Sequence, residues 1–307
     1  MSAHALNPFG RRGRRALALV CLLGTPALFA ETLAPVGERM AVEESLKIDF
    51  QRHVLPLLSR AGCNGRDCHG SAQGKGGFQL SLFGYDFDAD HKALTKLVEK
   101  HGVARADKDN PADSLVLKKP AREVAHKGGK RIEKGSWQYD LLLRWIQQGA
   151  PAQNRQQRFE RLEVEPAEIV FGKSGDAAAL RVVAVWADGT REDVTALTRF
   201  QSNNDGVAVV EPTGRVTARG SGDTHIVAFY DNGVAAVPVM QPLPGKSAQD
   251  ASPAVTAVDR HIQTKLAKLG ITPSKLCSDE EFLRRASIDM TGTLPAPAEV
   301  ETFLSDT

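Results

Sequence analysis

The sequence predicts a multidomain protein whose structured parts are helical, then all-β, then helical again: residues 42–150, 161–240 and 253–307. Three observations predict this order. Apolar residues recur at helical spacing in the first part, alternate with period two in the second, and return to helical spacing in the third. Linkers rich in polar residues, proline and glycine separate the three parts, at residues 151–157 and 241–247. We therefore expect an all-α domain, a β-sandwich and a helical C-terminal segment.

The first 30 residues have the features of an export signal, a signal peptide over 1–30. Four arginines precede the apolar stretch 16–30, which ends in Leu28-Phe29-Ala30. This stretch is shorter than the roughly 20 residues that cross a bilayer comfortably. We expect cleavage after Ala30 and export to the periplasm or the cell surface, and retention as a membrane anchor is the alternative.

Loss of the export signal changes the charge balance. The chain carries a formal net charge of +2, and residues 1–30 contain four arginines and no acidic residue, so the remaining chain has a net charge of −2. A chain without a basic excess lacks the electrostatic footprint of a general nucleic-acid-binding protein. We therefore expect no nucleic-acid partner.

Two amphipathic helices are predicted near the ends of the first domain. One presents an apolar face and leads into a loop with two cysteines: Phe50, Val54, Leu57 and Leu58. Ser136 is the predicted N-cap of the other, which carries an apolar stripe: Trp137, Leu141, Leu142, Trp145 and Ile146. We expect the two helices to pack together and bracket a cofactor, and an ordinary hydrophobic core is the alternative.

The loop contains two cysteines followed at once by a histidine: Cys63, Cys68 and His69. In such an arrangement the thiols can add to the two vinyl groups of a haem while the histidine ligates the iron. The usual spacer between the cysteines has two residues, and this one has four. Two other interpretations stay open here. One is a short Cys63–Cys68 disulfide in an oxidising compartment, and the other is a zinc site, for which a second pair of ligands is missing nearby.

Other segments of the first domain resemble one known family. They lie at residues 50–56, 77–86 and 145–151. Together with the cysteine loop they resemble the planctomycete-type cytochrome c domain, in which a longer cysteine spacer is common. The resemblance implies a haem-binding domain with one covalent haem c, held by Cys63 and Cys68, and with His69 as the proximal iron ligand.

The distal iron ligand is predicted by elimination and by the same resemblance. Residues 42–150 contain no methionine, which is a common distal ligand, and the remaining histidines are His53, His91, His101 and His126. His126 stands where related cytochromes carry a Met-Pro loop, so we predict it as the distal ligand. An open or water-bound iron is the alternative. His53, His91 and His101 are expected at the solvent-exposed surface.

Seven basic residues accompany His126 in the sequence: Lys118, Lys119, Arg122, Lys127, Lys130, Arg131 and Lys134. These charges would neutralise haem propionates or steer an acidic redox partner protein. A solvated loop surface is the alternative. Two histidine ligands predict a lower reduction potential than histidine with methionine.

The second domain has the pattern of short strands separated by turns. Residues 180–186 read as a buried strand, and Asp188-Gly189 and Asp231-Asn232-Gly233 are hairpin-turn signals. About seven short strands favour a β-sandwich. Residues 186–190 and 214–218 resemble the bacterial group 2 immunoglobulin-like domain. We expect a spacer, and adhesion or polysaccharide contact is the alternative.

The last segment reads as capped helices. An apolar stripe ends at Gly270: Val255, Val258, Ile262, Leu266 and Leu269. Ser278 begins a capping box for a second helix, and a third, shorter helix follows. Residues 282–292 resemble the start of a larger uncharacterised domain of planctomycete proteins. We expect the segment to be a truncated version of that domain.

These observations predict an exported c-type cytochrome module that transfers single electrons to a redox partner protein. No pair of residues stands out as a catalytic acid and base, so we expect no enzymatic activity in the chain itself. Two alternatives belong to other classes. One is a haem-free surface-binding protein with a Cys63–Cys68 disulfide, and the other is an enzyme whose catalytic part lies outside this sequence.

Overall fold

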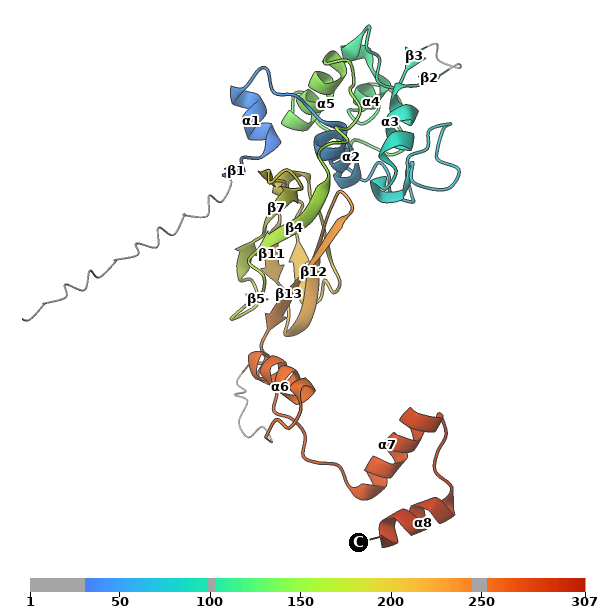
Figure 1. Ribbon diagram of the computed structural model, residues 1–307, viewed down its shortest axis with the longest axis vertical. Helices are drawn as coiled ribbons and strands as arrows, with labels where there is room; N and C mark the ends of the chain where they lie inside the picture. Colours follow the sequence, from blue (N-terminus) through green and yellow to red (C-terminus); the bar gives the residue numbers. More distant parts are fainter. Residues whose placement is uncertain (1–30, 99–102, 245–252, 307) are drawn as a thin grey trace, which may run out of the picture. The chain divides into compact units, whose positions relative to one another are not determined.

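A computed structural model describes residues 31–98, 103–244 and 253–306 (Figure 1). The described chain is multidomain, with a mainly helical first region, a β-rich centre and a helical C-terminal region, in the order that the sequence predicts. The predicted export signal at 1–30 and the side chain of His101 lie outside the described residues.

The first region is mainly helical. Its helices and strands are, in chain order, α1 (Val36–Val42), a π-helical turn (Phe50–Val54), α2 (Leu55–Arg60), α3 (Phe87–Thr95), β2 (Leu97–Val98), β3 (Val103–Ala104), α4 (Leu115–Lys118) and α5 (Trp137–Gln147). Short 3₁₀ turns lie at Leu82–Gly84 and Pro111–Asp113. β2 and β3 form an antiparallel ribbon.

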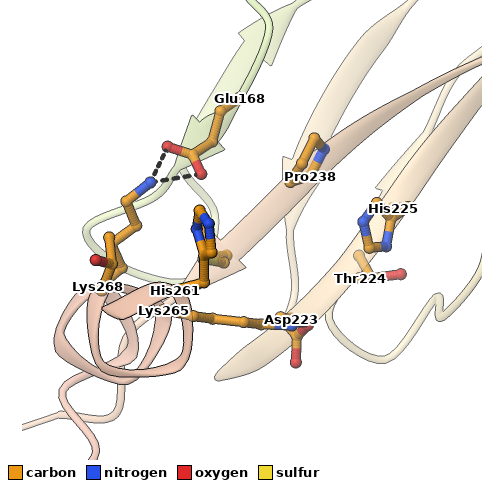
Figure 2. Close-up of a pocket in the computed structure, with 10 residues that line it drawn as sticks. Glu168, Asp223, Thr224, His225, Pro238, His261, Lys265 and Lys268 are labelled. Atoms are coloured by element: carbon orange, nitrogen blue, oxygen red, sulfur yellow. Dashed lines mark hydrogen bonds and ion pairs between the residues drawn. The ribbon is translucent and has the colours of Figure 1, made fainter. Parts of the chain in front are cut away.

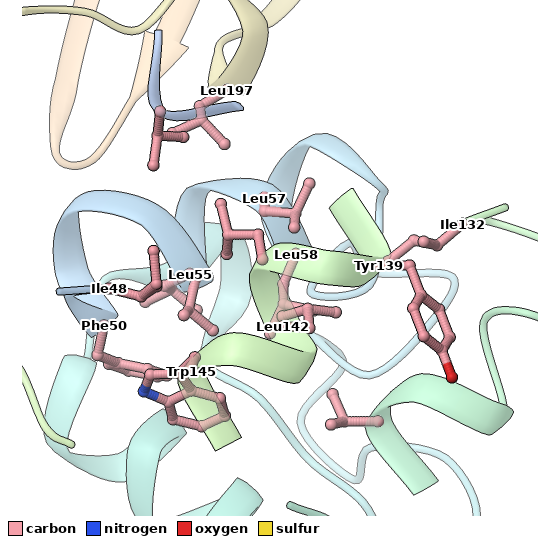
Figure 3. Close-up of a cluster of buried hydrophobic side chains, with 14 of the residues drawn as sticks. Ile48, Phe50, Leu55, Leu57, Leu58, Ile132, Tyr139, Leu142, Trp145 and Leu197 are labelled. Carbon is pink, nitrogen blue, oxygen red and sulfur yellow. The ribbon is translucent and has the colours of Figure 1, made fainter. Parts of the chain in front are cut away.

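The core of this region lies between α2, with its preceding π-helical turn, and α5 (Figure 3). The predicted apolar face is buried, with at most 2% of any residue exposed: Phe50, Val54, Leu57 and Leu58. The ring of Trp145 on α5 lies 5.6 Å from that of Phe50. Burial of side chains this large contributes about 1.5–3 kcal/mol each. These contacts hold α2, and with it the cysteine loop that follows, against α5.

The β-rich region contains ten strands. They are β4 (Phe159–Glu165), β5 (Ile169–Val170), β6 (Ala177–Ala179), β7 (Arg181–Trp186), β8 (Arg191–Asp193), β9 (Arg199–Ser202), β10 (Ala208–Val210), β11 (Arg215–Ala218), β12 (Gly222–Tyr230) and β13 (Gly233–Gln241). Two four-stranded sheets have the orders β1-β8-β7-β4 and β5-β13-β12-β9, where β1 is Thr32–Leu33. A three-stranded sheet has the order β10-β11-β6.

Both predicted hairpin turns are confirmed. Asp188-Gly189 joins β7 to the antiparallel β8, and Gly189 adopts a φ of +82°. Asp231 and Asn232 join β12 to β13, which pair from Tyr230 opposite Gly233 onward. β12 alternates buried and half-buried residues, so one of its faces lies on the core.

The helical and β-rich regions share a buried cluster of charges. The carboxylate of Glu192 on β8 is fully buried and pairs with Arg39, Arg52 and His53. The hydroxyl of Tyr230 on β12 donates a hydrogen bond to the carbonyl of Arg52 at 2.7 Å. A buried carboxylate costs several kcal/mol unless it is paired. This cluster therefore fixes β8 and β12 against the start of the helical region.

Helix boundaries follow the predicted caps. The hydroxyl of Ser136 accepts a hydrogen bond from the backbone N of Tyr139 at the start of α5, and Ser278 does the same for Glu281. Gly270 ends its helix in the left-handed conformation, with a φ of +66°. Local sequence therefore determines these ends.

The C-terminal region contains α6 (Ala257–Leu269), α7 (Asp279–Thr291) and α8 (Pro297–Ser305). The predicted apolar stripe of α6 is largely exposed, with Val258 67% and Ile262 53% exposed, whereas Leu269 is buried. Sequence periodicity therefore predicts the helix but not whether its apolar stripe is buried.

Candidate functional site

The cysteine loop leaves α2 through a hydrogen-bonded turn. The backbone N of Cys63 donates to the carbonyl of Leu58 at 2.9 Å. Gly62 adopts a φ of +78°, which favours glycine. The backbone N of His69 then donates to the carbonyl of Cys63 at 2.9 Å. This bond closes the four-residue spacer, so both cysteines and His69 lie on one compact turn.

Part of the long spacer folds into the loop interior. Asn64 is only 1% exposed, and its Nδ2 donates to the hydroxyl of Ser59 at 2.6 Å. Gly70 passes so close that a Cβ on it would lie 1.9 Å from the carbonyl oxygen of Asn64. The sequence analysis does not identify Asn64 as a residue that packs inside the loop. Gly70, which allows the close approach, is the only sequence feature that indicates it.

The two thiols of the loop are unpaired and half-buried. Burial raises the pKa of the Cys63 thiol to about 12, the nearby Cys68 adds to this rise, and Arg131 opposes it. A thiol with such a pKa is protonated at neutral pH and is a poor nucleophile. The folded loop therefore holds Cys63 as an unreactive thiol next to Cys68.

The ring of His69 is held by Phe78. Its Nδ1 lies 3.1 Å from the carbonyl oxygen of Phe78, and the two ring centroids are 4.6 Å apart. Burial lowers the pKa of His69, and this carbonyl partly offsets the effect. A neutral imidazole whose Nδ1–H donates to a carbonyl keeps the lone pair of Nε2 for a metal.

His126 is held in the same manner on a second loop. Its Nδ1 lies 2.8 Å from the carbonyl oxygen of Gly129. The half-buried ring lies against Gly128, where an added Cβ would come within 2.9 Å of it. Position 128 therefore needs a residue without a side chain if the ring is to keep this orientation.

The structure brings His69 and His126 together. Their ring centroids are 6.4 Å apart and their planes differ by 10°. An imidazole nitrogen binds a first-row metal at about 2 Å, so two imidazoles on opposite sides of one ion have centroids roughly 6 Å apart. Two nearly parallel imidazoles from different loops therefore lie close enough to bind one ion between them.

The basic residues around His126 are partly neutralised. Three of them form ion pairs: Lys118 with Asp113 at 2.5 Å, Lys130 with Glu133 at 2.6 Å and Lys134 with Glu123 at 3.1 Å. Arg131 donates through Nε to the carbonyl of Gly128 at 2.8 Å. The surface is therefore less positive than the sequence suggests.

The prediction that His53 and His91 lie at the exposed surface is wrong. His53 is 4% exposed, and its Nδ1 accepts a hydrogen bond from the backbone N of Asp49 at 3.0 Å. His91 is half-buried, with Nε2 2.9 Å from the carbonyl oxygen of Ala150. Both rings therefore form hydrogen bonds with other protein atoms.

Two hollows lie elsewhere in the described residues. One of about 300 Å³ separates β12 and β13 from α6, and the ion pair between Lys268 and Glu168 lies at its rim (Figure 2). Another of about 440 Å³ lies beside Phe78 and Arg105. The cysteines, His69 and His126 line neither hollow.

One comparison with known proteins concerns the C-terminal region. Residues 257–307 match a protein family described as PSCyt2, protein of unknown function (DUF1549). The match confirms the predicted resemblance of the last segment to an uncharacterised domain. It covers less than half of the chain and includes none of the residues of the cysteine loop.

A solved structure, domains 5–6 of the S-layer protein SbsC, matches at 18% identity and a TM-score of 0.25. The match covers 32% of this chain and 57% of that chain, so this chain spans less than two thirds of that structure. A likeness this weak has no bearing on fold or function. No curated protein matches the chain.

No helix among the residues that the structure describes is long and apolar enough to cross a membrane.

Proposed function

We propose that the chain is an exported c-type cytochrome module that binds one haem c and transfers single electrons. Cys63 and Cys68 would hold the haem covalently, with His69 as proximal and His126 as distal iron ligand. The observation that carries the proposal is the pair of parallel imidazoles with centroids 6.4 Å apart. The resemblance of residues 50–151 to planctomycete-type cytochrome c domains supports it.

The donor atoms fit a haem better than a zinc ion. A zinc site needs four ligands that converge on one point. Among the described residues, no group of three or more histidine, cysteine, aspartate or glutamate side chains does so. A haem iron needs only two ligands from the protein, and the imidazoles of His69 and His126, whose Nδ1 atoms are engaged, would supply them.

The residues around the two imidazoles orient and tune them. Bound haem supplies a one-electron couple in which ferric iron takes up one electron and becomes ferrous. Donation from the two Nδ1 atoms to the carbonyls of Phe78 and Gly129 would keep both Nε2 lone pairs for the iron. Two imidazoles favour the ferric state more than imidazole with thioether, so the reduction potential of the bound haem would be low for a c-type cytochrome.

The burial of Cys63 bears on how the haem would be attached. Its thiol has a raised pKa and is a poor nucleophile once the loop has folded. Haem attachment would therefore precede closure of the loop by the hydrogen bond between His69 and Cys63.

In this proposal the β-rich region serves as a spacer. It would be an immunoglobulin-like domain, as the resemblance of its sequence implies. The module would work in the periplasm or at the cell surface, with a redox partner protein as donor or acceptor. Because Glu192 ties β8 to the helical region, the spacer would hold the haem in a fixed orientation.

A reduced-minus-oxidised absorption spectrum of residues 31–307, produced with haem-attachment machinery, tests the proposal. We expect a low-spin spectrum in the wild type and carbon monoxide binding only after His126→Ala opens the distal position. His225→Ala, a histidine on β12 outside the site, should leave the spectrum unchanged. A wild-type protein without a haem spectrum would reject the proposal and leave the haem-free binding protein.

A further inference from the structure

The guanidinium of Arg105, just after β3, lies over the ring of Phe78, with Cζ 4.4 Å from the ring centroid. Its Nη2 donates to the carbonyl of Gly77 at 2.7 Å, and its Nη1 donates to the carbonyl of Ala93 at 3.2 Å. Two carbonyls and one aromatic face therefore hold the guanidinium in a single position.

Phe78 joins this cation to the proximal histidine. One face of the Phe78 residue is in contact with Arg105, its ring lies 4.6 Å from that of His69, and its carbonyl accepts from His69 Nδ1. The positive charge of Arg105 therefore lies one aromatic ring away from the imidazole.

Among the residues that the structure describes, no acidic side chain neutralises the charge of Arg105. Within the described residues it forms hydrogen bonds to carbonyls and no ion pair with an acid. The residue is half-buried, and burial lowers the pKa of its guanidinium. A partly desolvated charge acts on its surroundings more strongly than an exposed one, because water screens it less.

We propose that Arg105 is a tuning residue whose fixed positive charge, placed behind His69 by Phe78, raises the reduction potential of the iron. The inference rests on the proposed function and deepens it. A nearby positive charge disfavours the more positive oxidised iron relative to the reduced iron. Arg105 would thus offset part of the low potential that two imidazole ligands produce.

Midpoint potentials of the haem-loaded chain test this, with wild type, Arg105→Gln, Arg105→Lys and Arg155→Gln compared. We expect Arg105→Gln to lower the equilibrium constant for reduction by about tenfold, which is about 59 mV for one electron. Arg105→Lys retains the charge and should stay close to wild type. Arg155, whose side chain is 76% exposed, is the matched control, and its loss should have no effect.

Haem content and the low-spin spectrum, measured on the same samples, distinguish a failure of haem binding from a failure of the role of Arg105. Wild-type protein without haem contradicts the proposed function itself. Loaded variants in which Arg105→Gln leaves the potential unchanged overturn the role of Arg105. Equal shifts in Arg105→Gln and Arg105→Lys also overturn it, because the effect would then come from lost packing and not from lost charge.

Discussion

The Nε2 of His53 lies 3.2 Å from Oε1 of Glu192, although 139 positions separate the two residues in the sequence. Arg39 and Arg52 approach the same carboxylate, which is fully buried. Three basic side chains of the helical region thus surround one acid of the β-rich region. This cluster of charges is the main polar contact between the two regions.

Glu192→Gln should destabilise the chain strongly. The substitution leaves buried cations without their counter-charge, and loss of one partner of a buried pair costs about 3–5 kcal/mol. Glu163→Gln on β4 is the matched control, because Glu163 pairs with Arg191 at a site where its side chain is 32% exposed. We expect a loss of about 1 kcal/mol or less there. Urea unfolding measures both, and equal losses would contradict the importance of the buried cluster.

The effect of Glu192 should depend on pH. Burial alone would raise the pKa of its carboxyl, but His53, Arg39 and Arg52 outweigh burial and hold it below the ordinary value of 4.5. A depressed pKa means that the stabilisation is present above pH 4.5 and is lost as the pH falls through the folded-state value. The difference in the free energy of unfolding between wild type and Glu192→Gln should therefore shrink below pH 4.5.

Asp231→Asn should stabilise the chain at neutral pH. Burial raises the pKa of Asp231 to about 6 from its ordinary 3.8, so ionisation lowers stability as the pH rises between these values. We expect a gain of about 1–2 kcal/mol at about pH 8 and almost none at about pH 3. Asparagine tolerates the φ of +53° and can still accept from Gln51. Urea titrations at both pH values provide the test, and a loss of stability at the higher pH would contradict it.

The cysteines should differ in reactivity. In the haem-free folded chain, alkylation should be fastest at the exposed Cys277 and slowest at Cys63, whose thiol pKa is raised to about 12. After denaturation Cys63, Cys68 and Cys277 should all react. In the haem-loaded chain, Cys63 and Cys68 should stay unmodified even when denatured. Peptide mass spectrometry measures this, and rapid alkylation of folded Cys63 would contradict the buried loop.

Gly128→Ala should displace the ring of His126, the distal ligand that we propose. The added Cβ would lie 2.9 Å from the ring of His126, so the ring must move. We expect a loaded protein with a weakened distal bond that binds carbon monoxide. Gly172→Ala, where a Cβ meets its neighbour at an ordinary 3.4 Å, is the control. Failure of Gly128→Ala to bind carbon monoxide would argue against His126 as a ligand.

Features determined by neighbouring residues could be predicted from the sequence. The N-cap at Ser136 and the turn at Asp188-Gly189 lie where their local patterns indicate. Their hydrogen bonds join residues close in the sequence, so short-range patterns carry the information.

Features that depend on distant partners could not be predicted. His53 reads as a solvated residue on a helix edge, because its partner Glu192 belongs to another region. Arg105 carries no local signal for its position over Phe78. For His126, the resemblance indicated the residue, but the parallel approach to His69 requires two loops to be placed by the core between α2 and α5.

The most direct test of the central claim is the intact mass of residues 31–307 after acid–acetone extraction, with Cys63→Ala/Cys68→Ala as the matched variant. We predict that the wild type retains the mass and absorption of one haem and that the double variant loses both. Wild-type protein that leaves extraction without haem, with Cys63 and Cys68 joined in a disulfide, would contradict it.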